Sequence, residues 1–482
     1  MNGNGHSVKK LQMPAGHYIL RRHLVRSAVC LPHYHGPIQP SRIRHRGIIA
    51  VALLLALIIS FSPASSLAAT LNVGPDAAYI SIQPAIDAAS DGDIIVVADG
   101  TYTGDENRNL NYKSKAITVR SLNGPRNCII DCATTSAGTN SAFRFLTSEG
   151  PDSILDGFTI TNATTSAILC TKASPTIRNC ILDSNHSVYH AGAVFCKDSL
   201  ATVENCVVKN NSSPTHGGGI YCWDSNVTVR NCAITANTAE TGGAIYCYNS
   251  TLTLLDSLIA GNHADFIGGG IASRFQNPVT IVNTTFVNNT AEAGPAIHRT
   301  NTNLTIVQNC IFWNNEDEDP ATDYQIVSDD IGPLFLSFCI VEGAAAAISA
   351  TSPQNVFYAD SNLALDPLLA DDYHLSSESP AVDAGDPNTI IADRTDIDSQ
   401  PRVLRRRIDI GADEAPYAGD VEPDNDIDLA DFAAFARSWL ETDCSPANDY
   451  CRFTDILHDG TVDQRDLMLF LENWPTISDT IP

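Results

Sequence analysis

Residues 226–249 read NVTVRNCAITANTAETGGAIYCYN, and this stretch is one copy of a pattern that recurs about every 26 residues from Thr176 to Asn315. Two columns of the pattern are rich in asparagine: Asn179, Asn205, Asn231, Asp256, Asn283 and Asn309, and Asn185, Asn211, Asn237, Asn262, Asn289 and Asn315. Three columns are apolar: Ile177, Val203, Val229, Leu254, Ile281 and Val307; Leu182, Val208, Ile234, Ile259, Phe286 and Phe312; and Ile168, Val194, Ile220, Ile245, Ile271 and Ile297. A spacing held over so many copies predicts stacked identical units, which is a solenoid.

The apolar runs within each copy are short, and they end at asparagine or glycine. Runs such as Val227–Val229 and Leu304–Val307 lack the long 3.6-residue period of a helix and are typical of strands between turns. One copy is therefore predicted to be one coil of a parallel β-helix, with successive coils about 4.8 Å apart. The fold class is all-β.

The first asparagine column has a physical reason. Val229 and Ile234 are both expected to point inward, yet they lie five residues apart, which strict alternation along a strand does not allow. A residue between them has to break the pleat, and Asn231 tolerates the left-handed conformation that does so. Stacked amides are expected to hydrogen-bond from coil to coil. We interpret these asparagines as turns rather than as sugar contacts or ligands, and the glycine runs at 217–219, 242–243 and 268–270 as a second corner.

Three segments resemble parts of known bacterial β-helix proteins. Ala236–Ile245 resembles the repeat of polymorphic outer membrane proteins, and Leu71–Gly104 resembles the opening cap of pectate-lyase-like proteins. Asp366–Glu414, which we call the closing segment, is similar to the last part of many secreted β-helix proteins, and we expect it to form the last coils and C-terminal cap. The resemblances imply a right-handed parallel β-helix over residues 69–415 that begins with a capping helix. No transmembrane barrel is expected after it. The apolar face of that helix is Ile82, Ala85, Ile86 and Ala89.

The first 68 residues have the order of a secretory signal. Lysines and arginines precede the apolar run Ile48–Phe61, and Ser66-Leu67-Ala68 follows as a cleavage site. The run is short for a membrane span, although a retained anchor stays an alternative. We expect a secreted or cell-surface bacterial protein. The formal net charge of −26 disfavours binding to nucleic acid or to anionic membranes.

Most of the 14 cysteines fall in two further columns of the repeat. Serine and threonine replace cysteine in both columns, which indicates small inward residues rather than obligatory disulfides. The columns are Cys180, Cys206, Cys232, Ser257, Thr284 and Cys310, and Cys170, Cys196, Cys222, Cys247 and Ser273. Metal binding by these cysteines is not expected, because no histidine accompanies them at ligand spacing. Cys444 and Cys451, in contrast, are expected to form a disulfide.

After Tyr417 the composition shifts to acidic residues on two short amphipathic patterns. Asp420–Asp431 has the register of a 12-residue calcium loop, and Asp455–Asp466 has it again 35 residues later. Each loop precedes an apolar helical pattern. The alternative is an acidic solvated linker.

Two such loops resemble the type I dockerin module, a small α-helical, EF-hand-like calcium-binding domain, and the resemblance implies such a domain over residues 416–482. It implies two Ca²⁺ ions and a cohesin-like partner. The implied ligands of one ion are Asp420, Glu422, Asp424, Asp426, Asp428 and Asp431, and those of the other are Asp455, Asp459, Thr461, Asp463 and Asp466. Asn425 stands where glycine is usual, Leu457 removes one ligand from the second loop, and positions 10 and 11 depart from the Ser-Thr of dockerins that bind cohesins.

The charges of the solenoid do not form a recognised catalytic motif. A polyuronate lyase needs a lysine or arginine base with cationic neutralisation, and a glycosidase needs two carboxylates that face one bond. The candidates are Lys172, Lys197, Arg178, Arg230, Glu204, Arg274, Arg299, Asp198, Asp224 and the pair Asp329-Asp330. We assign no catalytic residue. The leading hypothesis is a non-catalytic β-helix scaffold that binds glycan or protein and docks through its calcium module. The alternative is a polysaccharide lyase or glycoside hydrolase on the same module.

Overall fold

The computed structural model describes residues 68–133, 139–275, 278–301, 303–317, 324–329, 332–370, 372–376, 378–390, 394–404, 407–415, 427, 429–444, 451, 454–456 and 460–474. The expected signal segment therefore lies outside the described residues, apart from Ala68. Within the described residues, no helix has both the length and the apolarity needed to cross a membrane.

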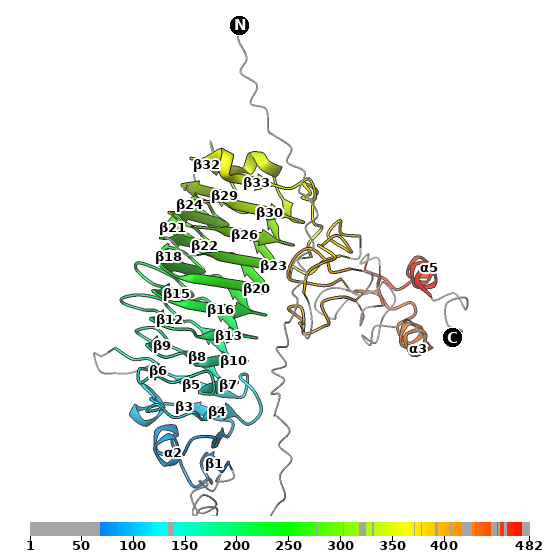
Figure 1. Cartoon of the computed structure of the whole chain (residues 1–482). Coiled ribbons are helices and arrows are strands. Elements are labelled where there is room, and N and C mark those ends of the chain that lie inside the picture. Colours follow the sequence, from blue (N-terminus) through cyan, green and yellow to red (C-terminus); the bar gives the residue numbers. More distant parts are fainter. Residues whose placement is uncertain are drawn as a thin grey trace, which may run out of the picture. The chain divides into compact units, whose positions relative to one another are not determined.

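The capping helix is confirmed. α2 (Ile82–Ala88) buries Ile82, Ala85 and Ile86 completely. It follows β1 (Thr70–Val73) and precedes β2 (Ile94–Val97), at the end of the stack from which the coils begin (Figure 1). An apolar helix face at this place covers the open end of the solenoid interior.

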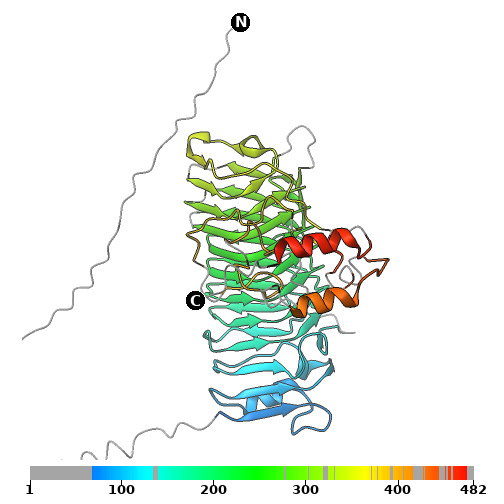
Figure 2. The same ribbon diagram turned by 90° about the vertical axis from the view of Figure 1, so that its right-hand side faces the viewer.

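The described strands form three parallel sheets, which confirms the β-helix (Figures 1 and 2). Sheet A holds β1, β2, β3 (Gly100–Tyr102), β4 (Thr118–Ser121), β5 (Cys128–Asp131), β7 (Ile154–Asp156), β8 (Thr159–Thr161), β10 (Thr176–Arg178), β11 (Ile181–Asp183), β13 (Thr202–Glu204), β14 (Val207–Lys209), β16 (Asn226–Arg230), β17 (Ala233–Thr235), β20 (Thr251–Ala260), β23 (Val279–Val287), β26 (Thr305–Gln308), β27 (Ile311–Trp313), β30 (Leu334–Ser337), β31 (Ile340–Val341) and β33 (Val356–Tyr358). Sheet B holds β6 (Phe143–Phe145), β9 (Ile168–Thr171), β12 (Val194–Lys197), β15 (Ile220–Trp223), β19 (Ile245–Tyr248), β22 (Ile271–Arg274), β25 (Ile297–Thr300), β29 (Ile326–Asp329) and β32 (Ile348–Ala350). Sheet C holds β18 (Thr238–Thr241), β21 (His263–Ile267), β24 (Thr290–Ala293) and β28 (Glu316–Asp317).

The three predicted apolar columns are the core of the solenoid. Register is kept from coil to coil, so that Val203 pairs with Val229 and Val229 with Leu254. All members of the three columns are buried. Val229 and Ile234 both point inward, as their places in the apolar columns predicted.

The sequence suggested that one asparagine column both makes the left-handed turn and stacks its amides, but the structure assigns these two roles to different columns. Every member of the column of Asn231 has φ between 49° and 54°, which confirms the left-handed turn. The continuous amide ladder lies in the other column, inside the solenoid. There each Nδ2 donates to the Oδ1 of the next coil at 2.8–2.9 Å, from Asn185 to Asn315. Asn315 then donates to Gln325, which ends the ladder.

The cysteine column next to the left-handed turn has a hydrogen-bonding reason. The thiol of Cys206 donates to the carbonyl of Glu204, two residues earlier, and Cys232 does the same to Arg230. Ser257 replaces the thiol with a hydroxyl that makes the equivalent bond. The position therefore needs a small donor, which explains why cysteine, serine and threonine interchange. The cysteines of both columns are buried and free, and burial raises the pKa of thiols such as Cys180 and Cys310.

The glycine corner is also confirmed. Gly217, Gly242 and Gly268 have φ between 64° and 69°, in the left-handed region that glycine favours. A Cβ at Gly218 would lie 2.4 Å from the carbonyl oxygen of Gly243. Close approach of successive coils thus requires glycine here.

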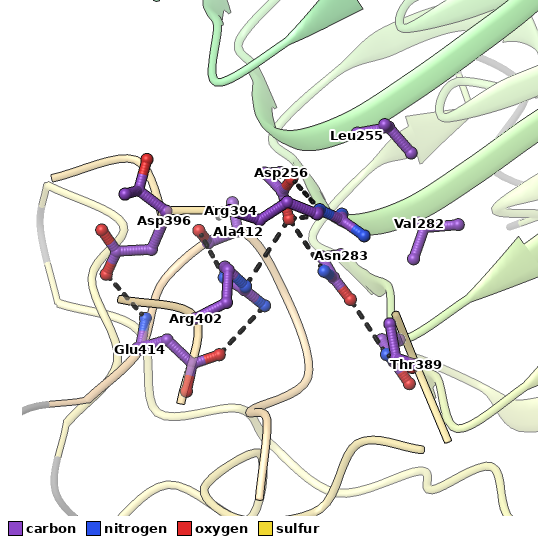
Figure 3. Close-up of polar contacts among 12 residues, drawn as sticks. Leu255, Asp256, Val282, Asn283, Thr389, Arg394, Asp396, Arg402, Ala412 and Glu414 are labelled. Atoms are coloured by element: carbon purple, nitrogen blue, oxygen red, sulfur yellow. Dashed lines mark hydrogen bonds and ion pairs between the residues drawn. The ribbon is translucent and has the colours of Figure 1, made fainter. Parts of the chain in front are cut away.

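The closing segment does not form the expected cap. It packs against the side of the solenoid, on the turns and strands of sheet A between β16 and β31. Arg394 makes two hydrogen bonds of 2.7 Å with the carboxylate of Asp256. Arg402 is completely buried between Asp256 at 3.5 Å and Glu414 at 3.1 Å (Figure 3). The expectation of a C-terminal cap was wrong because Arg394 and Arg402 bind the carboxylate of Asp256, which lies on the side of the stack and not at its end.

Replacement of Asn237 by alanine tests the ladder. Its side chain bonds Asn211, Val208 and Asn262, so the change leaves several buried groups without partners. We expect a loss of about 3 kcal/mol in the free energy of unfolding, measured by urea denaturation. The control is Asn226→Ala, at the exposed first residue of β16. Equal stability of the two variants would contradict a structural ladder.

Replacement of Asp256 by asparagine tests the attachment of the closing segment. Asparagine is the usual residue of this column and keeps the turn, but it removes the charge that faces Arg394 and Arg402. We expect a loss of about 3 kcal/mol, because a buried arginine loses a partner, and faster tryptic cleavage within residues 394–407. Asp105→Asn, at an exposed carboxylate that pairs with Arg108, is the control and should cost under about 1 kcal/mol. Unchanged cleavage in Asp256→Asn would show that the segment is held by other contacts.

Candidate functional site

The outward side of sheet B carries a continuous group of aromatic side chains, which we call the aromatic face: Phe195, Tyr221, Trp223, Tyr246, Tyr248 and Phe275. Alternation places the five strand residues there, because Ile220 and Cys222 of the same strand as Tyr221 and Trp223 point into the core. Phe275 lies in the left-handed turn that directly follows β22. Parallel register then aligns Phe195 with Tyr221 and Tyr246, and Trp223 with Tyr248.

The rings of the aromatic face touch from coil to coil. Ring centroids are 5.2 Å apart for Phe195 and Tyr221 and 5.0 Å apart for Tyr221 and Tyr246. In the neighbouring column, Trp223 lies 6.1 Å from Tyr248. Phe275, in the turn directly after β22, lies 5.1 Å from Tyr248. These are the separations at which aromatic pairs attract each other.

Exposure differs between the two columns. Tyr221 and Tyr246 are 5% and 1% exposed, so they form the floor, whereas Trp223 and Tyr248 are half-buried and Phe275 is 42% exposed. The accessible part of the aromatic face is thus Phe275 together with the partly exposed sides of Trp223 and Tyr248.

Two cations flank this row. The ammonium group of Lys197 lies 4.2 Å from the ring centroid of Trp223, in cation–π contact. Arg274 is exposed and follows Tyr248 in the same column. Burial raises the pKa of Tyr246, and the neighbouring Arg274 opposes that rise.

Histidines border the floor of the aromatic face. The ring of His216 lies 4.5 Å from that of Tyr246, and His190 lies 5.6 Å from Tyr221. Burial lowers the pKa of both imidazoles, and for His216 the neighbouring His190 and Arg274 lower it further. Further along, buried His298 lies 3.3 Å from Asp329, and its pKa is lowered by burial although the carboxylate opposes the change.

The charges selected from the sequence are only partly brought together. Lys197, Arg274 and Asp329 share one outward column of sheet B. Arg299, another of the candidate charges, does not face solvent: it points inward in the column of Cys247 and Ser273 and donates to the carbonyl of Gly332 at 2.9 Å.

The remaining candidates have structural roles. Arg178 pairs with Asp156 at 2.9 Å, and Arg230 pairs with Glu204. Lys172, Asp198 and Asp224 occupy left-handed turns after their strands. Asp330 lies outside the described residues.

Sequence reasoning missed the aromatic face, although a signal for it was present. Each aromatic residue of the first column follows a member of the isoleucine-rich column by one position. Phe195, Tyr221 and Tyr246 therefore already formed a column opposite in phase to the core.

The C-terminal residues form a small cluster of their own. α3 (Leu429–Arg437) and α5 (Gln464–Asn473) lie side by side (Figure 2), and the rings of Phe435 and Phe470 are 5.2 Å apart. Cys444 and Cys451 form the expected disulfide beside this core.

The described members of the two acidic loops are largely buried carboxylates. Asp431, Asp455 and Asp466 are each exposed by 1% or less. The amide of Gly460 donates to Asp455 at 2.9 Å, and the amide of Asp463 donates to Asp466 at 2.9 Å. Thr461 forms an antiparallel bridge with Thr442. Asp420, Glu422, Asp424, Asp426, Asp428 and Asp459 lie outside the described residues.

Comparison with known proteins identifies the solenoid. A family model described as right handed beta helix region matches residues 88–226 and 215–358. Similar solved structures include pectate lyase Pel9A, at 13% identity and a TM-score of 0.41 over 73% of this chain and 97% of that one. Another is an alginate lyase from Paenibacillus sp. str. FPU-7, at 14% identity and a TM-score of 0.27 over 61% of this chain and 99% of that one. No curated protein matches the chain. The matches to the family model span more than half of the chain, which belongs to the right-handed β-helix family.

Proposed function

We propose that this protein is a secreted or cell-surface, non-catalytic β-helix that binds polysaccharide on the aromatic face of sheet B. The carrying observation is the row formed by Trp223, Tyr248 and Phe275 on three successive coils. The C–H groups of a sugar ring carry partial positive charge, and the face of an aromatic ring is negative, so the two pack well. A glycan along the stack would meet a further coil about every 4.8 Å.

The charges of this face favour binding over hydrolysis. Asp329 is the one carboxylate among the described residues of its two outward columns, between β6 and β32. A glycosidase needs two carboxylates about one sugar bond. We therefore disfavour a glycoside hydrolase on this face.

A polysaccharide lyase is the second candidate, and one observation favours it. Arg274 lies beside Tyr246, and His298 with Asp329 follows on neighbouring coils. A cation next to groups that exchange protons is what β-elimination from a uronate would require. The acidic chain, at −26, opposes the approach of such a polyanion.

Replacement of Trp223 by alanine tests the binding face. We expect affinity for the bound polysaccharide to fall about thirty-fold, equivalent to about 2 kcal/mol, because a central aromatic contact is removed. The measurement is isothermal titration calorimetry against a panel of neutral and uronate-containing polysaccharides. Phe357→Ala is the matched control, since Phe357 belongs to an exposed stacked pair with Phe335 on sheet A.

The outcomes separate the two candidates. Binding lost in Trp223→Ala and kept in Phe357→Ala, without new unsaturated ends, supports a scaffold. Release of unsaturated ends that stops in Arg274→Ala makes the protein a lyase. If Trp223→Ala and Phe357→Ala both bound the polysaccharide as tightly as wild type, the ligand would bind elsewhere and the aromatic face would not be the binding surface.

We further propose that residues 416–482 bind Ca²⁺ and dock a cohesin-like partner. Support comes from Asp455 and Asp466, which open and close the second loop. Both are buried within a domain that also has a disulfide and its own apolar core. Carboxylate oxygens are the ligands that calcium prefers, and the residues present fit such an ion.

Replacement of Asp466 by asparagine tests the calcium proposal. Asparagine keeps an acceptor for the amide of Asp463 but removes the charge, so the second site should weaken at least tenfold while the first stays intact. Calorimetric titration of the chelator-treated protein with CaCl₂ should show two equivalents in wild type and one in the variant. Asp443→Asn, at an exposed acid outside both loops, should keep two.

A wild type that binds no calcium at millimolar concentration would end this part of the proposal. Where calcium does bind, a cohesin-like module should be retained on the full chain with calcium and released by chelator. Retention that ignores chelator would separate docking from the metal.

A further inference from the structure

A second group of metal-ligating side chains lies in the closing segment, apart from the aromatic face and the acidic loops. His374, Asp398 and Asp413 each offer one ligand atom, and these atoms all lie within 4.8 Å of one another. The Nε2 of His374 is 2.9 Å from Oδ2 of Asp398. Ligands around a tetrahedral zinc ion lie roughly 3.3 Å apart, so small side-chain rotations would bring the three atoms to coordination distance.

A fourth residue holds the imidazole in place. Oδ1 of Asp372 is 3.0 Å from Nδ1 of His374, on the side of the ring opposite Asp398. An outer carboxylate on the second ring nitrogen is the usual way in which proteins orient a metal-binding histidine, because it leaves Nε2 free to coordinate.

Asp413 is fixed from a different direction. Its side chain is buried, and its Oδ2 accepts a hydrogen bond of 2.7 Å from the amide of Leu375, the residue after His374. The backbone next to His374 therefore positions the carboxylate of Asp413. His374 and Asp398 are partly exposed, which leaves room for water to complete the coordination.

The site joins three separate parts of a segment with little regular structure. Between β33 and α3 the described residues contain no helix and no strand, and their ladder contacts are isolated bridges such as Leu369–Leu375 and Thr395–Pro401. His374 lies within the turn of the first bridge, directly before Leu375, and Asp398 lies within the turn of the second. Asp413 lies on the stretch that packs against the solenoid, next to Ala412, whose amide donates to Thr285. One ion would connect all three, as metals do in small folds with little core.

We propose that His374, Asp398 and Asp413 bind one divalent transition-metal ion, Zn²⁺ in the first instance, with Asp372 as the outer partner of the histidine. One imidazole with two carboxylates suits zinc, whereas calcium and magnesium prefer oxygen ligands alone. The competing explanation is an ion pair between a protonated imidazole and its carboxylates, with no metal.

Zinc titration of the full chain tests the proposal. The protein is stripped with chelator, dialysed and titrated with ZnCl₂ by calorimetry, in wild type and in His374→Gln, Asp398→Asn and Asp372→Asn. We expect one equivalent of zinc in wild type, its loss in His374→Gln, and affinity reduced at least tenfold in Asp398→Asn and ten- to a hundred-fold in Asp372→Asn. Asp398 is partly exposed, so its variant should fold even if others do not.

The matched control is His263→Gln. His263 also faces an aspartate, Asp265, at 3.3 Å, but lies on sheet C, so its replacement should leave this equivalent intact. Histidines elsewhere, including those before residue 68, contribute equally to wild type and variants, so the difference between them measures this site. Asp466→Asn should lose one of the two equivalents of calcium and keep zinc, which separates the two metals.

Cobalt provides a second readout. Co²⁺ in the stripped protein should give visible absorption bands that His374→Gln lacks and His263→Gln keeps. Equal zinc uptake by wild type, His374→Gln and Asp398→Asn would overturn the proposal. The proposal would also be overturned if wild type bound no zinc and zinc did not change the tryptic cleavage of the closing segment.

Discussion

Parallel stacking in constant register is the constraint on which this structure depends. Each coil completes the hydrogen bonds of the one before, so each buried amide of the inner asparagine ladder needs an acceptor at the same position of the next coil. The amide of Asn237 shows this directly, since it accepts from Asn211 and donates to Asn262. Unpaired, such an amide would cost roughly 1–3 kcal/mol. The columns therefore repeat because each member depends on its neighbours.

Departures from the columns are for this reason informative. Asp256 stands where the other coils have asparagine, and its charge is the one that Arg394 and Arg402 reach from the closing segment. Arg299 stands in a column of cysteine and serine and donates to Gly332 at the far end of the stack. In both cases the residue that departs from its column makes a contact outside the repeat.

The sequence predicted the core in detail and the surroundings poorly, for one physical reason. Inward positions such as Val229 and Ile234, the left-handed Asn231 and the helix of Ile82 obey local periodicity, which a sequence displays. The partner of Asp256 lies 138 residues away, and no local pattern encodes that distance. The aromatic face was within reach, because Tyr221 and Tyr246 repeat in phase, but it was overlooked in a search for charges. The inward position of Arg299 could not be predicted, because the other members of its column, such as Cys247 and Ser273, are small and no pattern announces a buried cation.

The two sides of the solenoid differ in what covers them, and this bears on function. On sheet A the closing segment packs over strands from β20 to β31, where Leu258, Val287 and Ile311 meet its apolar residues. The described contacts of that segment fall on sheet A, while on sheet B Phe275 and Arg274 stay exposed. An exposed ring such as that of Phe275, beside the half-buried rings of Trp223 and Tyr248, costs solvation free energy unless a ligand covers it. The chain's own closing segment thus covers part of sheet A and leaves the aromatic face of sheet B partly accessible, which is the condition that our proposal of glycan binding requires.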